Sequence, residues 1–217
     1  HQVELSSSTV GAVRVDVLFL IDTTGSMGDE IARLQANISS VAEQVDALEG
    51  DPDVRFGMTV YRDRGDAFVT RTFDFTSDVA EFGTALDEVT ADGGGDTPED
   101  LNAGLHDALT KPAWRGEDTV KLVFLVADAP PHLDYDGPDY ADDAVAAAEQ
   151  GVKIIPVASS GLDDQGEYVF RQLAQVTMGT FVFLTYGADG AAPGDDTTHH
   201  VDDYSVLALD ELVVRVV

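Results

Sequence analysis

Cysteine is absent from all 217 residues of the sequence. Disulfide bonds, thiolate metal sites and cysteine nucleophiles are therefore excluded together. Long hydrophobic runs are also missing: none approaches the roughly 20 residues that a membrane-spanning helix needs, so we expect no insertion into a membrane. The hydrophobic fraction of 44% instead indicates a globular fold with a substantial core.

Basic residues are scarce, since 12 lysines and arginines stand against 41 acidic residues and the net charge is −29. Such a surplus disfavours nucleic acids and anionic membrane surfaces as partners, because both would be repelled. It is compatible with cation binding, and with solubility in high salt, where charges on the surface are screened.

Hydrophobic strand-like runs alternate with amphipathic helical stretches along the chain. This alternation predicts right-handed crossovers and a doubly wound, Rossmann-like α/β fold, with a mostly parallel sheet and helices on both faces. A hairpin turn at 62–66 adds one antiparallel edge strand. The predicted strands are 13–22, 53–63, 67–75, 119–128, 152–160 and 180–187, and the predicted helices are 28–50, 77–90, 99–109, 141–151 and 167–179.

The remaining segments complete the predicted domain organisation. Residues 1–12 are polar and are expected to form a lead-in, and residues 13–217 are expected to form a single domain. Within it, 188–204 is expected to be irregular, and 205–217 is expected to close the chain as a helix or a strand.

Two aspartates end hydrophobic strands: Asp22 follows the first strand and Asp128 follows the fourth. In open α/β sheets, ligands bind outside the carboxyl ends of the strands, at the point where strand order reverses. We therefore expect Asp22 and Asp128 to lie at the edge of the sheet where a ligand would bind.

Hydroxyl side chains accompany these aspartates. Thr24 and Ser26 follow the first strand two residues apart, and Thr97 lies in a glycine-rich loop at 91–100. Hard divalent cations prefer oxygen ligands, and Mg²⁺ takes six in near-octahedral array. A site built largely on neutral hydroxyls would leave the ion much of its positive charge, so the ion would attract an acidic group from a partner.

Helix capping is the competing interpretation of the same residues. Ser26 with Asp29 reads as a capping box, and Thr97 followed by Pro98 reads as the start of a helix. Each motif alone favours a cap. The coincidence of two hydroxyl-bearing turns with two strand-end aspartates on one edge of the sheet favours a metal site.

The motif "DTTGSM", which begins at Asp22, resembles the D-x-S/T-x-S motif of von Willebrand factor type A domains, the metal-ion-dependent adhesion site. "GGGDTPEDLNAGL" resembles the threonine loop of that family, and "VFLVADAPPH" resembles the segment with its distal aspartate. The resemblance extends over residues 13–183. One departure is Thr24, where many members carry serine, but the hydroxyl is retained.

The resemblance implies a Rossmann-like fold and a site for Mg²⁺, or for Ca²⁺ or Mn²⁺. It implies that Thr24, Ser26 and Thr97 bind the ion directly, and that Asp22 and Asp128 bind it directly or through water. Three further residues are candidates for supporting the site or contacting its ligand: Asp96, Gly25 and His132.

The function implied is cation-dependent binding or adhesion, not catalysis. The expected partner is a protein that offers an acidic residue to the metal, with a glycan as a further possibility. The chain is expected to be a monomeric domain of a larger extracellular or cell-surface protein.

Two other functions stay open from the residues alone. One is a scaffold domain whose metal is purely structural. The other is a metal-dependent phosphatase or hydrolase with Asp22 as nucleophile, a chemistry that typically needs a second acid two residues later and a nearby lysine. Position 24 is threonine and no lysine lies near a candidate loop, so this second alternative is disfavoured.

Three remaining sequence features are interpreted as ordinary turns or loops without a binding function. The tripeptide Arg64-Gly65-Asp66 is read as a turn and not as an integrin-binding motif. The acidic, histidine-containing segments 132–139 and 195–203 could each hold a further cation, but solvated acidic loops are the favoured interpretation.

Overall fold

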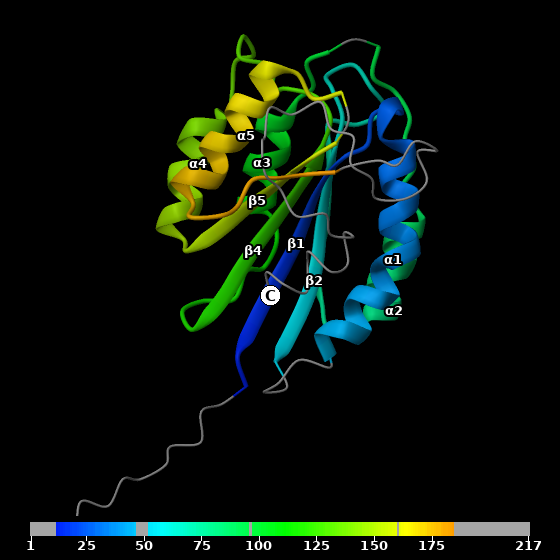
Figure 1. Cartoon of the computed structure of the whole chain (residues 1–217), viewed down its shortest axis with the longest axis vertical. Helices are drawn as coiled ribbons and strands as arrows, with labels where there is room; N and C mark the ends of the chain where they lie inside the picture. The colour runs from blue at the N-terminus through cyan, green and yellow to red at the C-terminus, as the bar shows by residue number, and fades with distance from the viewer. Residues whose placement is uncertain (1–11, 47–51, 96, 160, 185–217) are drawn as a thin grey trace, which may run out of the picture.

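The computed structural model describes residues 12–46, 52–95, 97–159 and 161–184, which form one six-stranded sheet with helices on both faces (Figure 1). The strand order is β3-β2-β1-β4-β5-β6, and every neighbouring pair is parallel except β2 and β3. The predicted doubly wound fold with one antiparallel edge strand is thus confirmed. The strands are β1 (Arg14–Asp22), β2 (Asp53–Tyr61), β3 (Thr70–Thr76), β4 (Thr119–Ala127), β5 (Val152–Ala158) and β6 (Val182–Phe183).

The helices divide between the two faces of the sheet. In Figure 1, α1 and α2 lie on one face, and α3, α4 and α5 lie on the other. A short 3₁₀ helix, η1, leads directly into α1. The bounds are η1 (Gly25–Met27), α1 (Gly28–Asp46), α2 (Val79–Asp87), α3 (Leu101–Thr110), α4 (Tyr140–Glu149) and α5 (Asp164–Val176).

Strand β1 is the centre of the core and explains why its sequence is almost continuously hydrophobic. Val17 and Phe19 pack with the cluster beneath α1 and α2, while Leu18 and Leu20 pack with the cluster beneath α3, α4 and α5. All four side chains are fully buried. Burial of each such side chain contributes about 1.5–3 kcal/mol, so a central strand covered on both faces anchors the fold.

The starts of three helices, α2, α3 and α5, differ from the sequence prediction by two or three residues. Asp78, not Ser77, caps α2, and Asp100, not Thr97, caps α3. Helix α5 begins at Asp164 behind the cap Asp163, three residues earlier than predicted. In each case an aspartate carboxylate accepts main-chain N–H groups of the first turn, a role that serine, threonine and aspartate fill comparably well. The local sequence therefore does not determine which of several neighbouring residues caps a helix. The packing of the loops does.

The hairpin between β2 and β3 is wider than predicted. Thr70 pairs with Tyr61, so the connection runs over 62–69 and not 62–66. The longer loop brings its polar residues to the carboxyl end of the sheet. The predicted segments 188–204 and 205–217 lie outside the described residues, as does most of the lead-in at 1–12.

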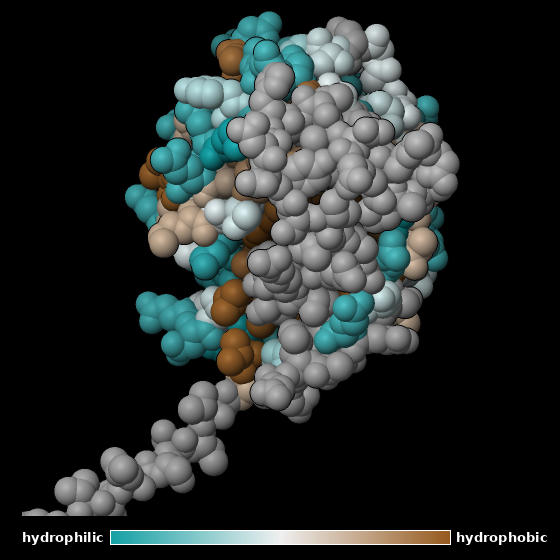
Figure 2. Space-filling model, in the orientation of Figure 1, coloured by the Kyte–Doolittle hydropathy of each residue, from teal (hydrophilic) through white to brown (hydrophobic). Residues whose placement is uncertain are grey.

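Hydrophilic residues dominate the visible surface around α4 and α5, consistent with the acidic composition (Figure 2). Large exposed hydrophobic side chains are spread over separate elements, such as Leu133 before α4 and Tyr168 on α5. None of the helices in the described ranges is long and apolar enough to cross a membrane.

Candidate metal site

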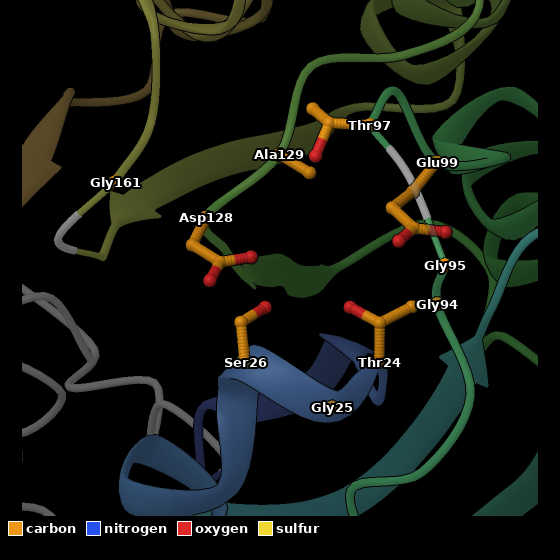
Figure 3. A pocket seen from close by; sticks show the side chains of 10 residues that line it. All are labelled: Thr24, Gly25, Ser26, Gly94, Gly95, Thr97, Glu99, Asp128, Ala129 and Gly161. Atoms are coloured by element: carbon orange, nitrogen blue, oxygen red, sulfur yellow. The ribbon is translucent and has the colours of Figure 1, made fainter.

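A pocket of about 440 Å³ lies at the carboxyl ends of β1 and β4, where the strand order reverses. This is the position at which doubly wound sheets bind ligands. Four of the predicted site residues line it with their side chains, Thr24, Ser26, Thr97 and Asp128 (Figure 3). Segments separated by a hundred residues in the sequence thus meet around one cavity.

Asp22 lies behind this pocket, at the end of β1, and is completely buried. Its Oδ1 accepts hydrogen bonds from the main-chain N–H of Thr24 at 2.9 Å and from the Thr24 hydroxyl at 2.7 Å. Because the Thr24 hydroxyl donates its hydrogen bond to Asp22, the lone pairs of the Thr24 oxygen remain available to another partner. Asp22 Oδ2 has no hydrogen-bond partner among the described residues, and burying a carboxylate oxygen in this state costs free energy.

The pKa of Asp22 is raised to about 7. Burial is the largest cause, because it disfavours the charged form. The two hydrogen bonds from Thr24 act in the opposite direction, while the negative charge of Asp128 raises the pKa further. A positive charge in the pocket would restore the ionised form of this carboxylate.

Ser26 lies inside η1 and therefore does not cap a helix, so the capping-box interpretation is wrong. The N-cap position of this short helix is occupied by Thr24, whose side chain makes no capping hydrogen bond. The Ser26 hydroxyl instead faces Asp128 across the lower left of the pocket (Figure 3). Burial raises the pKa of Asp128, and a hydrogen bond from Ser26 offsets only part of that effect.

The glycine-rich loop is held against the η1 turn by main-chain contacts. Gly25 N–H donates to Gly93 O at 3.1 Å, and Gly94 N–H donates to a carboxylate oxygen of Asp66 at 3.1 Å. Gly94 has φ +66°, and a Cβ there would lie 2.9 Å from Cβ of Thr24. Only glycine fits this conformation and this approach, which brings the loop that carries Thr97 close to the pocket.

His132 is not among the residues that line the pocket. Its ring stacks on Tyr135 at 3.7 Å between centroids, and its Nδ1 lies 2.9 Å from a carboxylate oxygen of Asp134. The structure therefore favours a supporting role for His132 over a direct contact with the ligand. The third supporting candidate, Asp96, lies outside the described residues.

The Arg64-Gly65-Asp66 tripeptide supports the loops of the site. The Arg64 guanidinium donates to Asp100 Oδ2 at 2.9 Å and lies 4.0 Å over the Tyr135 ring. The Asp66 carboxylate holds the glycine-rich loop, as described above. Both charged side chains are therefore occupied within the molecule, which agrees with the interpretation of this motif as a turn.

Glu99 is a pocket residue that the sequence interpretation missed. It lines the cavity, is only 3% exposed, and its Oε2 has no hydrogen-bond partner in the described part of the chain. Burial, followed by the charges of Asp22 and nearby aspartates, raises its pKa to about 8. The sequence "TPED" predicts that Glu99 lies in the first turn of a helix. In the structure Asp100 is the cap, so Glu99 lies before α3 and its side chain belongs to the loop.

The donors in the pocket fit a hard divalent cation. Three hydroxyls and two carboxylates line it, and a third carboxylate lies directly behind Thr24. No group of three or more histidine, aspartate or glutamate side chains in the described ranges could bind a metal alone, so hydroxyls must complete the coordination. The unpartnered oxygens of Asp22 and Glu99 are polar groups that a bound cation would compensate.

Two curated proteins share sequence with this chain. The alpha-protein kinase vwkA of Dictyostelium discoideum is 34% identical over 145 residues, which cover 64% of this chain and 22% of the kinase. The putative ariadne-like RING finger protein R811 of Acanthamoeba polyphaga mimivirus is 30% identical over 121 residues, which cover 54% of this chain and 11% of that protein. The matched region is therefore a small part of each relative.

Solved structures share the fold. Proximal thread matrix protein 1 from the mussel byssus, with a zinc-occupied MIDAS motif, superposes with a TM-score of 0.59 at 18% identity, covering 79% of this chain and 42% of that one. The SpRpn10 VWA domain superposes with a TM-score of 0.57 at 12% identity, covering 80% of this chain and 88% of that one. The sequence profile described as von Willebrand factor type A domain matches residues 16–187. This chain therefore belongs to the von Willebrand factor type A family.

Proposed function

We propose that this chain is a divalent-cation-dependent binding module, whose ion recruits an acidic side chain of a partner protein. The observation that supports this most directly is the convergence of three hydroxyls with Asp128 on one pocket, while Asp22 remains buried behind it. The cation would supply a Lewis-acidic centre at which a carboxylate can bind. The type A family often mediates protein interactions through such a metal.

The roles of the chain's own residues follow from their contacts. Thr24, Ser26 and Thr97 would hold the ion through their hydroxyl oxygens, and Asp128 through its carboxylate. Asp22 orients Thr24 by accepting both its main-chain N–H and its hydroxyl proton. Groups that support ligands in this way commonly change metal affinity 10–100-fold when they are removed.

Mg²⁺ is the proposed ion, with Ca²⁺ and Mn²⁺ as alternatives, because the donors are all oxygen atoms. The mussel protein with a zinc-occupied MIDAS motif supports a divalent metal at such a site without selecting among these ions. The acidic character of the chain favours accumulation of cations near its surface.

Binding, not catalysis, is the proposed role. The residue two positions after Asp22 is Thr24, so the acid expected of an aspartyl phosphatase is missing, and no lysine or arginine is among the residues that line the pocket in the described structure. We further propose an extracellular or cell-surface setting within a larger protein, on the strength of the resemblance noted in the sequence.

Isothermal titration calorimetry with MgCl₂ tests the site. We expect micromolar to millimolar affinity for the unaltered chain and a loss of about tenfold or more in Ser26→Ala, because a ligand oxygen is removed. The exposed Ser77→Ala is the matched control and should bind as the unaltered chain does. Equal affinity in Ser26→Ala and the unaltered chain would contradict the assignment. A pull-down with and without a chelator then tests whether partner capture depends on the ion.

A further inference from the structure

Glu99 is held at the rim of the pocket by its main chain. Its N–H donates to Pro130 O at 3.0 Å, and its carbonyl accepts from His132 N at 3.2 Å. These bonds form a short parallel bridge between the glycine-rich loop and the segment that follows β4. Asp100 then starts α3 immediately afterwards. The Glu99 side chain therefore projects from a backbone that is fixed on both sides.

That side chain is directed into the pocket. Figure 3 shows the carboxylates of Glu99 and Asp128 on opposite sides of the cavity, with the three hydroxyls between them. The Glu99 carboxylate also lies close to the loop beneath it, since a Cβ on Gly94 would stand 3.0 Å from Oε1. A side chain that is only 3% exposed, and whose Oε2 has no partner in the described ranges, is positioned for a ligand in this cavity.

Among the residues that the structure describes, no lysine or arginine lines this pocket to compensate Glu99. The nearby Arg64 is engaged by Asp100, and Arg62 donates to the carbonyls of Thr23 and Thr90. Asp22 and Asp128 add negative charge to the same region. An uncompensated buried carboxylate is costly, so a cation from solvent is the natural partner for this group.

We propose that Glu99 contributes a further carboxylate to the cation site, from the wall opposite Asp128, and thereby raises the affinity of the site for its ion. The proposal rests on the cation-binding function argued above and adds to it a residue outside the D-x-S/T-x-S motif, the threonine and the distal aspartate. It means that the chain's own share of the coordination is more anionic than those motifs indicate.

Titration of Ca²⁺ and Mg²⁺ into Glu99→Gln tests this by calorimetry. The substitution removes the charge at nearly constant size, and affinity should fall about tenfold or more for at least one ion. The control Glu117→Gln removes an exposed charge just before β4, at the opposite end of the sheet, and should have no effect. Glu99→Asp, which keeps the charge, should have an intermediate affinity and also provides a second variant if Glu99→Gln folds poorly.

Thermal unfolding with and without cation separates a ligand role from a structural one. In Glu99→Gln, the midpoint in chelator should stay equal or rise, because Glu99 Oε2 has no hydrogen-bond partner among the described residues that the substitution could remove, while the increase caused by cation should shrink. Equal loss of stability with and without cation would show a purely structural role and overturn the proposal. Unchanged ion affinity in Glu99→Gln, alongside a loss in Ser26→Ala, would overturn this inference and leave the proposed function standing. An unaltered chain that binds no cation would overturn the proposed function itself.

Discussion

The two ends of strand β1 carry two fully buried aspartates in opposite situations. Asp16, near the amino end, accepts hydrogen bonds from Arg55 Nε at 3.0 Å and Nη2 at 2.8 Å, and from Arg115 Nε at 2.7 Å and main-chain N at 2.9 Å. Within the described part of the chain, Asp22, at the carboxyl end, accepts only from Thr24, and its Oδ2 has no partner. The two carboxylates belong to one strand and differ in what surrounds them.

The pKa values follow that difference. Burial by itself would raise the pKa of Asp16, but the hydrogen bonds from Arg55 and Arg115 and their positive charges outweigh burial and lower it. At Asp22, burial prevails and raises the pKa to about 7. A buried carboxylate that the protein has neutralised is part of the framework, whereas one left uncompensated at a pocket is a candidate binding group.

Asp16→Asn should produce the largest effect on folding. It leaves two largely buried guanidinium groups without their shared carboxylate, and we expect the free energy of unfolding to fall by about 3 kcal/mol, measured by urea denaturation. Asp53→Asn is the control, because Asp53 contacts the same Arg115 but is half exposed, and it should cost less than about 1 kcal/mol. Similar losses in the two variants would contradict the structural role of Asp16.

Gly94→Ala changes the loop at the carboxyl end of β1, and it should reduce cation affinity more than it reduces the free energy of unfolding. The added Cβ meets Thr24 and requires a backbone conformation that costs about 1–3 kcal/mol for other residues, so the loop should shift and cation affinity should drop about tenfold or more. Calorimetry with Mg²⁺ measures this. Gly95→Ala adds the same atom at a position with no described neighbour within 4 Å, and should change the affinity little. An equal loss in both glycine variants would indicate a general effect on the loop.

The contributions of Asp16 and Asp22 to the free energy of unfolding should change in opposite directions with pH. The stabilisation from Asp16 is present above its ordinary pKa of 3.8 and is lost as the pH falls below it. For Asp22 the stabilisation is present below 3.8 and is lost as the pH rises through about 7.

In chelator, the unaltered chain should therefore lose stability relative to Asp22→Asn between pH 5 and pH 8. The comparison is made from urea unfolding at both pH values, and it cancels the contributions of the other carboxylates to first order. A difference that stays constant over this range would argue that Asp22 is ionised in the folded protein without a cation.

Much of the site could be predicted because its main residues occur in short motifs at strand ends. Thr24 and Ser26 are two residues apart on one turn, and the end of a parallel strand determines the edge at which they appear. Helix starts were less predictable, because Asp78 and Asp100 compete with Ser77 and Thr97 as equally suitable caps. His132 is a candidate both for supporting the site and for contacting its ligand, and only the structure shows that its ring stacks on Tyr135 and lies beside Asp134.

The amino-acid sequence is enough to predict the order of strands and helices, the buried character of β1, and the hydroxyl and carboxylate set that resembles the type A motif. These properties depend on periodicity and on short-range spacing, which the chain carries locally. Which buried carboxylates are neutralised by positive charges depends instead on the three-dimensional packing. Arg115 reaches Asp16 across 99 positions of sequence, and Glu99 faces Asp128 because its main-chain hydrogen bonds to Pro130 and His132 fix its backbone. Such pairings depend on how distant segments pack, and electrostatic compensation depends on those distances.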